Sequence, residues 1–280
     1  MLSPYLVENR HVAVKRCKHG VFMFNRNDTF IGKSLDQYGE WCDFEIQLLR
    51  RYVAPGDIVI DCGANIGTHT IAFANLVGPT GRVYAYEPQR RNFLMLSGNV
   101  ALNGLDNVFC RQQAVGDVDG HLAMPPLPSA DTHFNFGGLP KEGTPDETVP
   151  VVRLDSLALS ACRLIKVDVE GMEAETLNGA RDLITRCRPL IYVENNEVES
   201  SRKLARLLDE FGYRAWWSLF WYFDVRNFYA NPVNCFENVR PSTNLLCAPK
   251  ELNLELGGLQ PFLGEMDDWK QAILRNDGQV

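Results

Sequence analysis

The sequence predicts an α/β fold in which a mostly parallel sheet is covered by helices on both faces. Three observations predict it. The β-branched run 58–60 suits a strand that is buried on both faces. Gly63 and Gly67 follow this run at the spacing of a tight turn, and residues 68–76 then have the apolar spacing of a helix. From there strand-like and helix-like segments alternate, which favours a parallel sheet.

The remaining elements follow from apolar periodicity and turn residues. Before the first core strand we expect a hairpin over 11–24, a polar loop over 26–39 and an amphipathic helix over 44–53. Further along, the expected elements are strands over 82–86, 108–112, 164–168 and 190–193, helices over 172–184 and 200–211, an aromatic β-like segment over 213–248 and a helix near 267–275. These elements predict an N-terminal cap (1–54) over the cofactor or substrate, a core (55–250) and a C-terminal tail (251–280).

Composition limits the function classes. The 280 residues carry a net charge of −7, which argues against a nucleic-acid partner because such proteins usually need a basic face. No stretch approaches the roughly 18 apolar residues of a membrane span, and the N-terminus lacks the pattern of a secretory signal. The eight cysteines include no C-x-x-C pair, which suits a reducing compartment. We therefore expect a cytoplasmic protein with neither a nucleic-acid nor a membrane partner.

The turn after the first core strand differs from a dinucleotide-binding turn. Asn65 and Thr68 stand where the G-x-G-x-x-G pattern needs glycines. Asp61 closes the strand and is expected to point into the space that a pyrophosphate would fill. A carboxylate there repels phosphate but suits a ligand with a cationic amino group. S-adenosylmethionine (SAM) carries an ammonium and a sulfonium and no phosphate, so it fits this turn.

An acid also closes the second core strand. Glu87 follows Gly63 at about the interval, roughly 20 residues, at which dinucleotide folds place a ribose-binding acid. Its carboxylate is expected to accept hydrogen bonds from both ribose hydroxyls. The turn alone also fits a purely structural role, but the turn together with Glu87 indicates a site for an adenosine-containing ligand.

Further acids follow the next two strands. In open parallel sheets, ligands bind beyond the carboxyl ends of the strands, so these side chains are expected to face the cofactor. Methyl transfer to a hydroxyl needs a group that accepts the proton. The candidate bases are Asp168, Glu170, Glu194 and, on a loop, His133. Glu170 also fits a helix start without any catalytic role.

Oxygen ligands at the same strand ends allow a second route. A Mg²⁺ ion held by two or three of them would lower the pKa of the acceptor hydroxyl. The candidate ligands are Asp168, Glu194 and Asn195. The metal-free route is the preferred one.

Residues 123–149 are predicted to form a long loop, because they contain several prolines and glycines and little periodicity. Residues 133–138 at its centre are too aromatic for a plain linker. The loop is therefore expected to act as a lid or to contact substrate, with Asn135 and Phe136 as substrate residues.

Several segments resemble the FkbM family of SAM-dependent methyltransferases, which has the Rossmann-like class I methyltransferase fold. The most family-specific is Lys-Val-Asp-Val-Glu-Gly-Met-Glu, residues 166–173. The other matching segments are residues 38–41, 59–68, 83–89, 135–138 and 192–195. The resemblance implies a seven-stranded sheet whose last strand is antiparallel. It also implies O-methylation of a sugar, glycan or polyketide-type hydroxyl, with SAM as cofactor.

The resemblance also assigns residues. Gln89 is expected to contact the adenosine, and Glu40 is expected to close over the amino-acid end of the cofactor. The positions that fall on the cofactor motif are Asp61, Gly63, Asn65, Gly67 and Glu87.

Two features depart from the family pattern. Asn196 stands where relatives would have an acid, which weakens a metal site at this point. The run 216–223 is unusually aromatic, and its default interpretation is a buried strand. The sharper hypothesis makes Trp217 a wall for a sugar ring or apolar acceptor, with Asn227 adding a polar contact.

Two other functions are compatible with such a chain. One is a NAD-dependent oxidoreductase, which would bind NAD tightly and not SAM. The other is a non-catalytic SAM- or glycan-binding protein, which would bind SAM without turnover.

Overall fold

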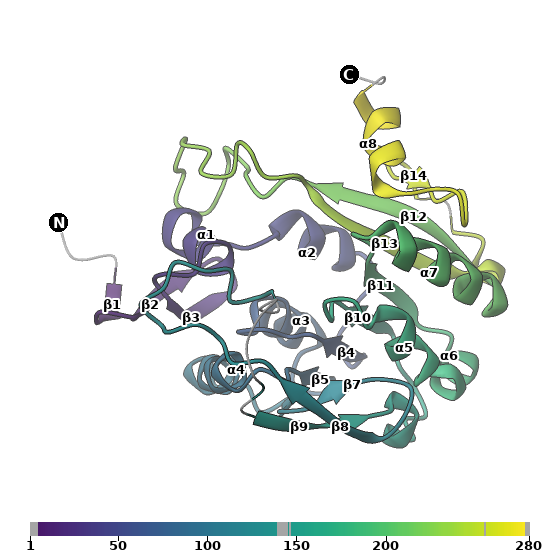
Figure 1. The fold of residues 1–280 in the computed structure, drawn as a ribbon, viewed down its shortest axis with the longest axis horizontal. Helices are drawn as coiled ribbons and strands as arrows, with labels where there is room; N and C mark the ends of the chain where they lie inside the picture. Colours follow the sequence, from purple (N-terminus) through teal and green to yellow (C-terminus); the bar gives the residue numbers. More distant parts are fainter. Residues whose placement is uncertain (1–4, 139–144, 146, 255, 278–280) are drawn as a thin grey trace.

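A mixed sheet forms the centre of the protein (Figure 1). The computed structural model describes residues 5–138, 145, 147–254 and 256–277. Within them the central sheet has eight strands in the order β14-β12-β13-β11-β10-β4-β5-β6. Their bounds are β4 Ile58–Cys62, β5 Arg82–Tyr86, β6 Val108–Arg111, β10 Leu164–Val167, β11 Leu190–Glu194, β12 Tyr213–Phe220, β13 Ser242–Pro249 and β14 Gln260–Pro261.

The sheet confirms the predicted class I methyltransferase topology and extends it. The neighbours β6, β5, β4, β10 and β11 pair in parallel. Strand β13 inserts antiparallel between β11 and β12, so the last of the seven expected strands is antiparallel. Strand β14 adds an eighth, pairing with β12 at Trp216 and Trp217. Its two residues are too few to show an alternating pattern, which is why the sequence did not predict it.

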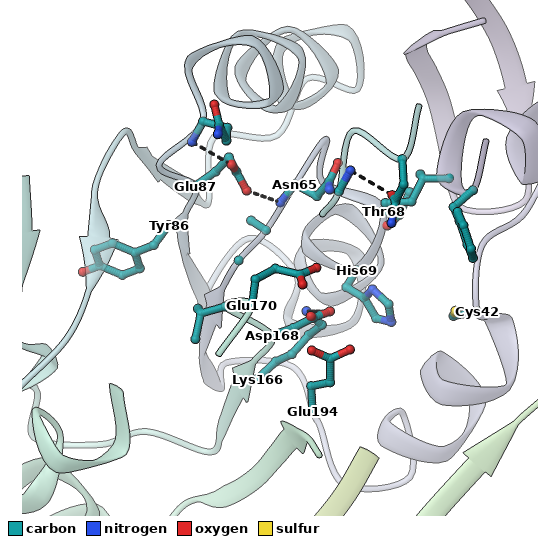
Figure 2. Close-up of a pocket in the computed structure, with 18 of the residues that line it drawn as sticks. Cys42, Asn65, Thr68, His69, Tyr86, Glu87, Lys166, Asp168, Glu170 and Glu194 are labelled. Atoms are coloured by element: carbon teal, nitrogen blue, oxygen red, sulfur yellow. Dashed lines mark hydrogen bonds and ion pairs between the residues drawn. The ribbon is translucent and has the colours of Figure 1, made fainter. Parts of the chain in front are cut away.

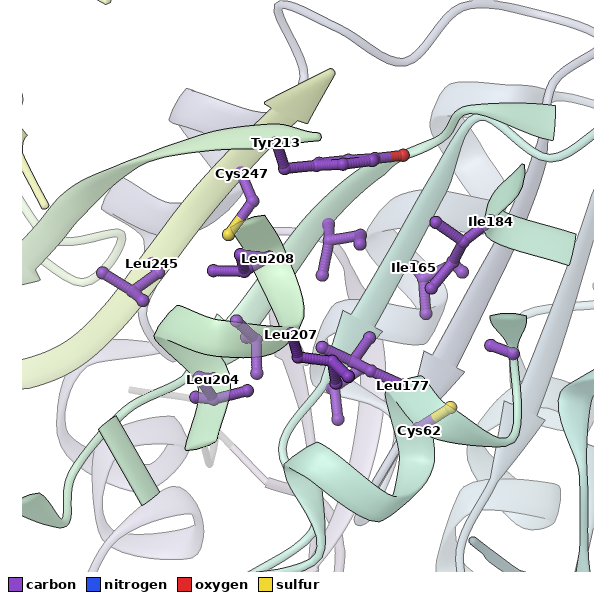
Figure 3. Packing of buried hydrophobic residues seen from close by; sticks show 14 of the residues in the cluster. Cys62, Ile165, Leu177, Ile184, Leu204, Leu207, Leu208, Tyr213, Leu245 and Cys247 are labelled. Atoms are coloured by element: carbon purple, nitrogen blue, oxygen red, sulfur yellow. The ribbon is translucent and has the colours of Figure 1, made fainter. Parts of the chain in front are cut away.

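Both faces of the sheet are covered, as the continuous apolar strands predicted. Side chains from α5 (Glu173–Asn178), α6 (Arg181–Cys187) and α7 (Val198–Glu210) pack on one face, around Ile60 and Ile165. Figure 3 shows this packing, with Leu177 of α5, Ile184 of α6 and Leu208 of α7 among its members. The other face packs against α2 (Asp43–Leu49), α3 (Thr68–Val77) and α4 (Arg90–Leu102).

The N-terminal region holds more regular structure than predicted. The expected hairpin is formed by β2 (Val12–Cys17) and β3 (Gly20–Asn25), and β1 (Tyr5–Glu8) adds a third strand. The predicted loop over 26–39 is wrong, because α1 spans Ile31–Tyr38. Buried residues four and three apart (Ile31, Leu35 and Tyr38) form one apolar stripe in an otherwise polar segment.

The predicted long loop over 123–149 is shorter in the structure. Its ends belong to β8 (Gly120–Met124) and β9 (Glu147–Val152), which form a second small sheet with β7 (Ala114–Val115). The part of the predicted loop at 139–144 and 146 lies outside the described residues.

The predicted helix over 172–184 divides into α5 and α6 near Gly179. A Cβ added to Gly179 would overlap the carbonyl oxygen of Gly116, so the chain approaches the β7 region closely there.

The C-terminal tail is tied to β12. Trp217 Nε1 donates to Asp267 Oδ2 at 2.9 Å, and Arg275 donates to both oxygens of the same carboxylate. The short helices η1 (Leu154–Leu157) and η2 (Lys250–Leu252) and α8 (Trp269–Asp277) complete the described elements. The described helices include none with the length and apolar character needed to cross a membrane.

Candidate active site

A cavity of about 320 Å³ opens at the carboxyl ends of β4, β5, β10 and β11. This is the edge at which parallel sheets bind ligands. Figure 2 shows the labelled lining residues in three groups. Glu87 and Tyr86 lie at one end, Lys166, Asp168, Glu170 and Glu194 lie in the centre, and His69 and Cys42 lie at the other end.

The turn after β4 is held between its two neighbouring strands. The backbone N–H groups of Gly63 and Ala64 both donate to the Tyr86 carbonyl at 2.9 Å. Gly63 has φ +76°, and an added Cβ would overlap the carbonyl oxygen of Asp168. Asn65 also has a positive φ, 51°, which asparagine tolerates better than most residues. The close approach of two backbones explains why the sequence has glycine at position 63.

Glu87 is fixed by backbone groups at the edge of this turn. Its carboxylate accepts hydrogen bonds from Asn65 N at 2.9 Å and Gln89 N at 2.8 Å (Figure 2). Burial raises the pKa of Glu87 to about 7, although these two donors oppose the shift. Gln89 is itself anchored by a bond from Nε2 to the Pro125 carbonyl. The structure thus brings Gly63, Asn65, Glu87 and Gln89 together in one wall.

The centre of the cavity is rich in carboxylates. Lys166 Nζ lies 3.3 Å from Asp168 Oδ2. Burial and the carboxylates of Asp168 and Glu170 raise the pKa of Glu194 well above its ordinary value. Glu194 Oε2 is buried and has no hydrogen-bond partner in the described part of the chain. Removal from water raises the pKa of Glu170 to about 7, and Asp168 adds to this shift. The unpartnered oxygen of Glu194 is therefore available to a ligand.

Asp61 does not face this cavity, contrary to the prediction. It is fully buried, accepts a hydrogen bond from Thr70 Oγ1 at 2.6 Å and lies 3.5 Å from Lys166 Nζ. Asp61 and Lys166 stand opposite each other in the parallel pairing of β4 and β10. Asp61 was expected to pair with the cationic amino group of the ligand, but in the structure it pairs with Lys166. Asp61 thereby holds this lysine in the cavity wall.

The far end of the cavity contains residues that the sequence did not single out as functional. His69 Nε2 lies 3.2 Å from Glu45 Oε2. The other oxygen of Glu45 accepts hydrogen bonds from Ser242 Oγ at 2.7 Å and Asn244 Nδ2 at 2.9 Å. Next to them Trp41 stacks on Tyr222, with ring centroids 5.0 Å apart. This wall combines an ion pair with an aromatic surface.

The sequence profile described as the methyltransferase FkbM domain matches residues 61–215. The chain belongs to the FkbM methyltransferase family. The matched region contains the turn after β4, Glu87 and the acidic centre, so the family resemblance seen in the sequence is confirmed.

Individual FkbM relatives are distant. The 31-O-demethyl-FK506 methyltransferase FkbM of Streptomyces tacrolimicus is 32% identical over 161 residues, or 46% of this chain and 61% of the relative. The hexuronic acid methyltransferase AglP of Haloferax volcanii is 27% identical over 170 residues, or 59% of this chain and 66% of the relative. The chain thus spans less than two thirds of the length of these relatives. A solved methyltransferase FkbM structure from Methylobacillus flagellatus KT is 18% identical with a TM-score of 0.45, covering 73% of this chain and 50% of that one.

Besides Asp61, two predicted cofactor residues of this FkbM chain, Glu40 and Gly67, lie outside the cavity wall. Glu40 Oε2 accepts bonds from Lys18 Nζ at 3.1 Å and Phe228 N at 3.0 Å, so the side chain joins two loops. Its neighbour Trp41 lines the cavity in its place. Gly67 stands at the start of α3 with φ +90° and packs against Leu96 of α4. It therefore shapes the turn and does not form the surface of the cavity.

Of the predicted acceptor residues, only Asn135 lines the cavity. Trp217 is 1% exposed and faces the tail, which confirms the default interpretation of a buried strand. The amide of Asn227 bonds to the carbonyls of Asp224 and Asn231 and so stabilises its own turn. Phe136 is buried beneath Arg91.

His133, predicted as a possible base, lies on the exposed surface and outside the cavity wall. The aromatic character of its loop comes from Phe134 and Phe136, which pack against each other. His133, which precedes these two phenylalanines, is exposed, so the composition of the loop did not identify a catalytic group.

The described residues contain no group of three or more His, Cys, Asp and Glu side chains arranged to hold a metal ion. Asn195, a predicted Mg²⁺ ligand, is buried and donates from Nδ2 to Ser201 Oγ at 3.0 Å. It lies outside the cavity wall that Glu194 lines, because consecutive residues at the end of β11 point to opposite sides. The predicted set of Asp168, Glu194 and Asn195 is therefore not brought together, and the Mg²⁺ prediction gains no support.

Proposed function

We propose that this FkbM chain transfers a methyl group from SAM to a hydroxyl of a sugar, glycan or polyketide-type acceptor. One observation carries the proposal. A single cavity joins an adenosine-type wall, formed by the turn after β4 and Glu87, to a carboxylate-rich centre. A ligand with a ribose at one end and cationic groups in the middle matches both parts.

The residues present fit SAM. Glu87 presents a fixed carboxylate to the ribose hydroxyls. The acids Asp168, Glu170 and Glu194 face the cavity with one lysine among them, which suits an ammonium and a sulfonium. The buried oxygen of Glu194 gains a partner when such a ligand binds. When bound, SAM supplies an electrophilic methyl group, and these side chains hold and orient it.

Two findings support a hydroxyl-bearing acceptor. The names of the relatives give 31-O-demethyl-FK506 and a hexuronic acid as their substrates. In this chain the end of the cavity opposite Glu87 carries the stacked rings of Trp41 and Tyr222. Aromatic faces offer a large contact area to a sugar ring or an apolar acceptor.

Transfer of radiolabelled methyl from SAM into a fractionated extract of the source cells tests the proposal. We expect label in a glycan or small-molecule fraction, with the same yield in the presence of EDTA. Loss of the label with EDTA would show that a metal is needed. SAM binding without label in any fraction would favour the non-catalytic alternative. The family assignment already argues against a NAD-dependent oxidoreductase.

A pH dependence of stability follows from Glu87. Because its pKa rises to about 7 in the folded chain, it stabilises the fold fully below about pH 4.5 and loses this contribution as the pH rises through 7. We expect the Tm of the free protein to fall between pH 5 and pH 8. A cationic ligand favours the ionised acids, so the rise in Tm caused by SAM should be larger at pH 8 than at pH 5.5.

Thermal denaturation with and without saturating SAM at both pH values measures this effect. S-adenosylhomocysteine (SAH), which lacks the sulfonium charge, serves as the ligand control and should show a weaker pH dependence. The variant Glu87→Gln should have a smaller Tm slope with pH in the free protein. A slope unchanged in that variant would contradict the assignment to Glu87.

A further inference from the structure

The pair formed by His69 and Glu45 has the geometry of an oriented base. Glu45, on α2, is 3% exposed and holds three polar contacts, with His69, Ser242 and Asn244. Burial raises the pKa of Glu45, but His69 and Ser242 outweigh it, so the pKa is lowered and the carboxylate is ionised. Such a buried charge is tolerated when its partners are fixed.

The Glu45 carboxylate favours one tautomer of the neutral imidazole of His69, the one that carries its proton on Nε2. Nε2 lies 3.2 Å from Glu45 Oε2, so an N–H at this nitrogen interacts with a negative charge. The N–H is not yet aligned as a hydrogen bond, as is common in catalytic sites before the substrate binds. Among the residues that the structure describes, none forms a hydrogen bond with Nδ1. The neutral ring therefore keeps a free lone pair on Nδ1.

His69 lies on the side of the cavity from which the acceptor has to approach. It lines the cavity at the end opposite Glu87, beyond the acidic centre (Figure 2). With the adenosine at Glu87, the reactive methyl of SAM lies toward the centre, and the acceptor has to approach from the far side. Trp41 and Tyr222 form the aromatic surface on that side.

The other groups that line this part of the cavity are less suited to accept a proton. Glu194 lies in the acidic centre, where burial and the neighbouring carboxylates raise its pKa well above its ordinary value, and its unpartnered oxygen is assigned to the cofactor in the proposed function. Asp168 is held by Lys166 at 3.3 Å. Burial raises the pKa of the Cys42 thiol well above its usual range, so it stays neutral. Glu45, Glu170 and Tyr222 also line the cavity, and Glu170 belongs to the acidic centre that is assigned to the cofactor in the proposed function.

We propose that His69, oriented by the positioning residue Glu45, is the general base that takes the proton from the acceptor hydroxyl. The inference rests on the proposed methyl transfer. The acceptor oxygen forms a bond to the methyl carbon while the carbon–sulfur bond breaks, and sulfur keeps that electron pair. The hydroxyl proton moves to Nδ1, and the imidazolium later releases it to water. The imidazolium is stabilised by Glu45, as in other carboxylate–histidine pairs.

The first test compares His69→Gln with the wild type, using the extract fraction that the wild type labels. We expect kcat to fall about 100-fold, the lower end of general-base contributions, while the Kd for SAM changes less than threefold. His121→Gln, at an exposed histidine on β8, is the matched control and should keep both values. A His69→Gln variant with more than half of the wild-type kcat would overturn the proposal.

The second test is the pH profile of kcat. The wild type should lose activity on the acidic side as the base becomes protonated, and this limb should vanish in His69→Gln. In Glu45→Gln the limb should move to lower pH, because loss of the carboxylate disfavours the protonated ring. A Glu45→Gln variant that is folded by circular dichroism but slowed equally at every pH would show a merely structural role.

A third test needs no acceptor and separates this inference from the proposed function. Nitrogen NMR of ¹⁵N-histidine-labelled protein at pH 8.5 reports which ring nitrogen carries the proton. We expect the Nε2–H form for His69, with this preference weakened in Glu45→Gln. An Nδ1–H form would overturn the base role even if methyl transfer is found. Absence of label in every extract fraction would instead overturn the proposed function.

Discussion

Replacement of Gly63 by alanine is expected to abolish SAM binding and to lower the free energy of unfolding by about 3 kcal/mol or more. The added Cβ would overlap the carbonyl oxygen of Asp168 at a backbone φ of +76°. To relieve this overlap, the turn after β4 has to move away from the segment after β10. Both of these segments line the cavity. Denaturant unfolding and isothermal titration with SAM measure the two effects.

Gly104→Ala separates overlap from backbone strain. Gly104 has a similar φ of +62°, but an added Cβ meets no atom within 4 Å. We expect this control to lose only about 1–2 kcal/mol, the cost of a left-handed residue, and to bind SAM normally. Equal losses of stability in the two variants would show that the contact with Asp168 is unimportant.

Replacement of Glu87 by alanine is expected to weaken SAM binding by roughly 1.5–3 kcal/mol, the range of a charge-assisted hydrogen bond. This corresponds to a rise in Kd of about 10- to 150-fold. The carboxylate also accepts hydrogen bonds from Asn65 N and Gln89 N, so alanine leaves two backbone donors of the site without their acceptor. Glu87→Gln keeps an acceptor oxygen and should give an intermediate Kd.

The control for Glu87 is a glutamate outside the site. Glu199 is on the exposed surface of α7, with Arg202 3.9 Å away as its ion-pair partner, so Glu199→Ala should bind SAM like the wild type. Unchanged affinity in Glu87→Ala would remove this residue from the ribose site. A Tm for SAM-free Glu87→Ala close to that of the wild type would confirm that the loss lies in binding and not in folding.

The residues of the cofactor wall could be predicted from the sequence because they are close together along the chain. Gly63, Asn65, Glu87 and Gln89 belong to one strand–turn–helix–strand unit, and the spacing within such a unit determines where each residue lies. The strand β4 was predicted well because its buried β-branched run has few alternatives, and β5 because its valine and tyrosines favour a strand. Asp61 was misplaced because its partner Lys166 comes from a strand whose register the sequence does not reveal.

The opposite wall was not predictable in this way. Only His69, on α3, belongs to the same unit as the cofactor wall. Glu45, Tyr222 and Asn244 come from α2, the segment after β12 and β13, and no spacing relates residues so far apart. The aromatic run illustrates the difficulty, because Trp217 faces the tail and Tyr222 faces the cavity. To predict which of the two faces the cavity, one must know where β12 ends. Residue propensities do not locate strand ends to within one or two residues.

The separate origin of the two walls has an evolutionary consequence. One wall is inherited as a single stretch of chain, so a gene copy that preserves this stretch keeps its cofactor chemistry. The other wall is assembled mainly from separate segments, namely α2 with the residues before it, the segment after β12 and the start of β13. Lineages descended from such a chain can therefore acquire new acceptors through changes in residues 41–45, 222 and 239–244. The residues that bind the methyl donor need not change.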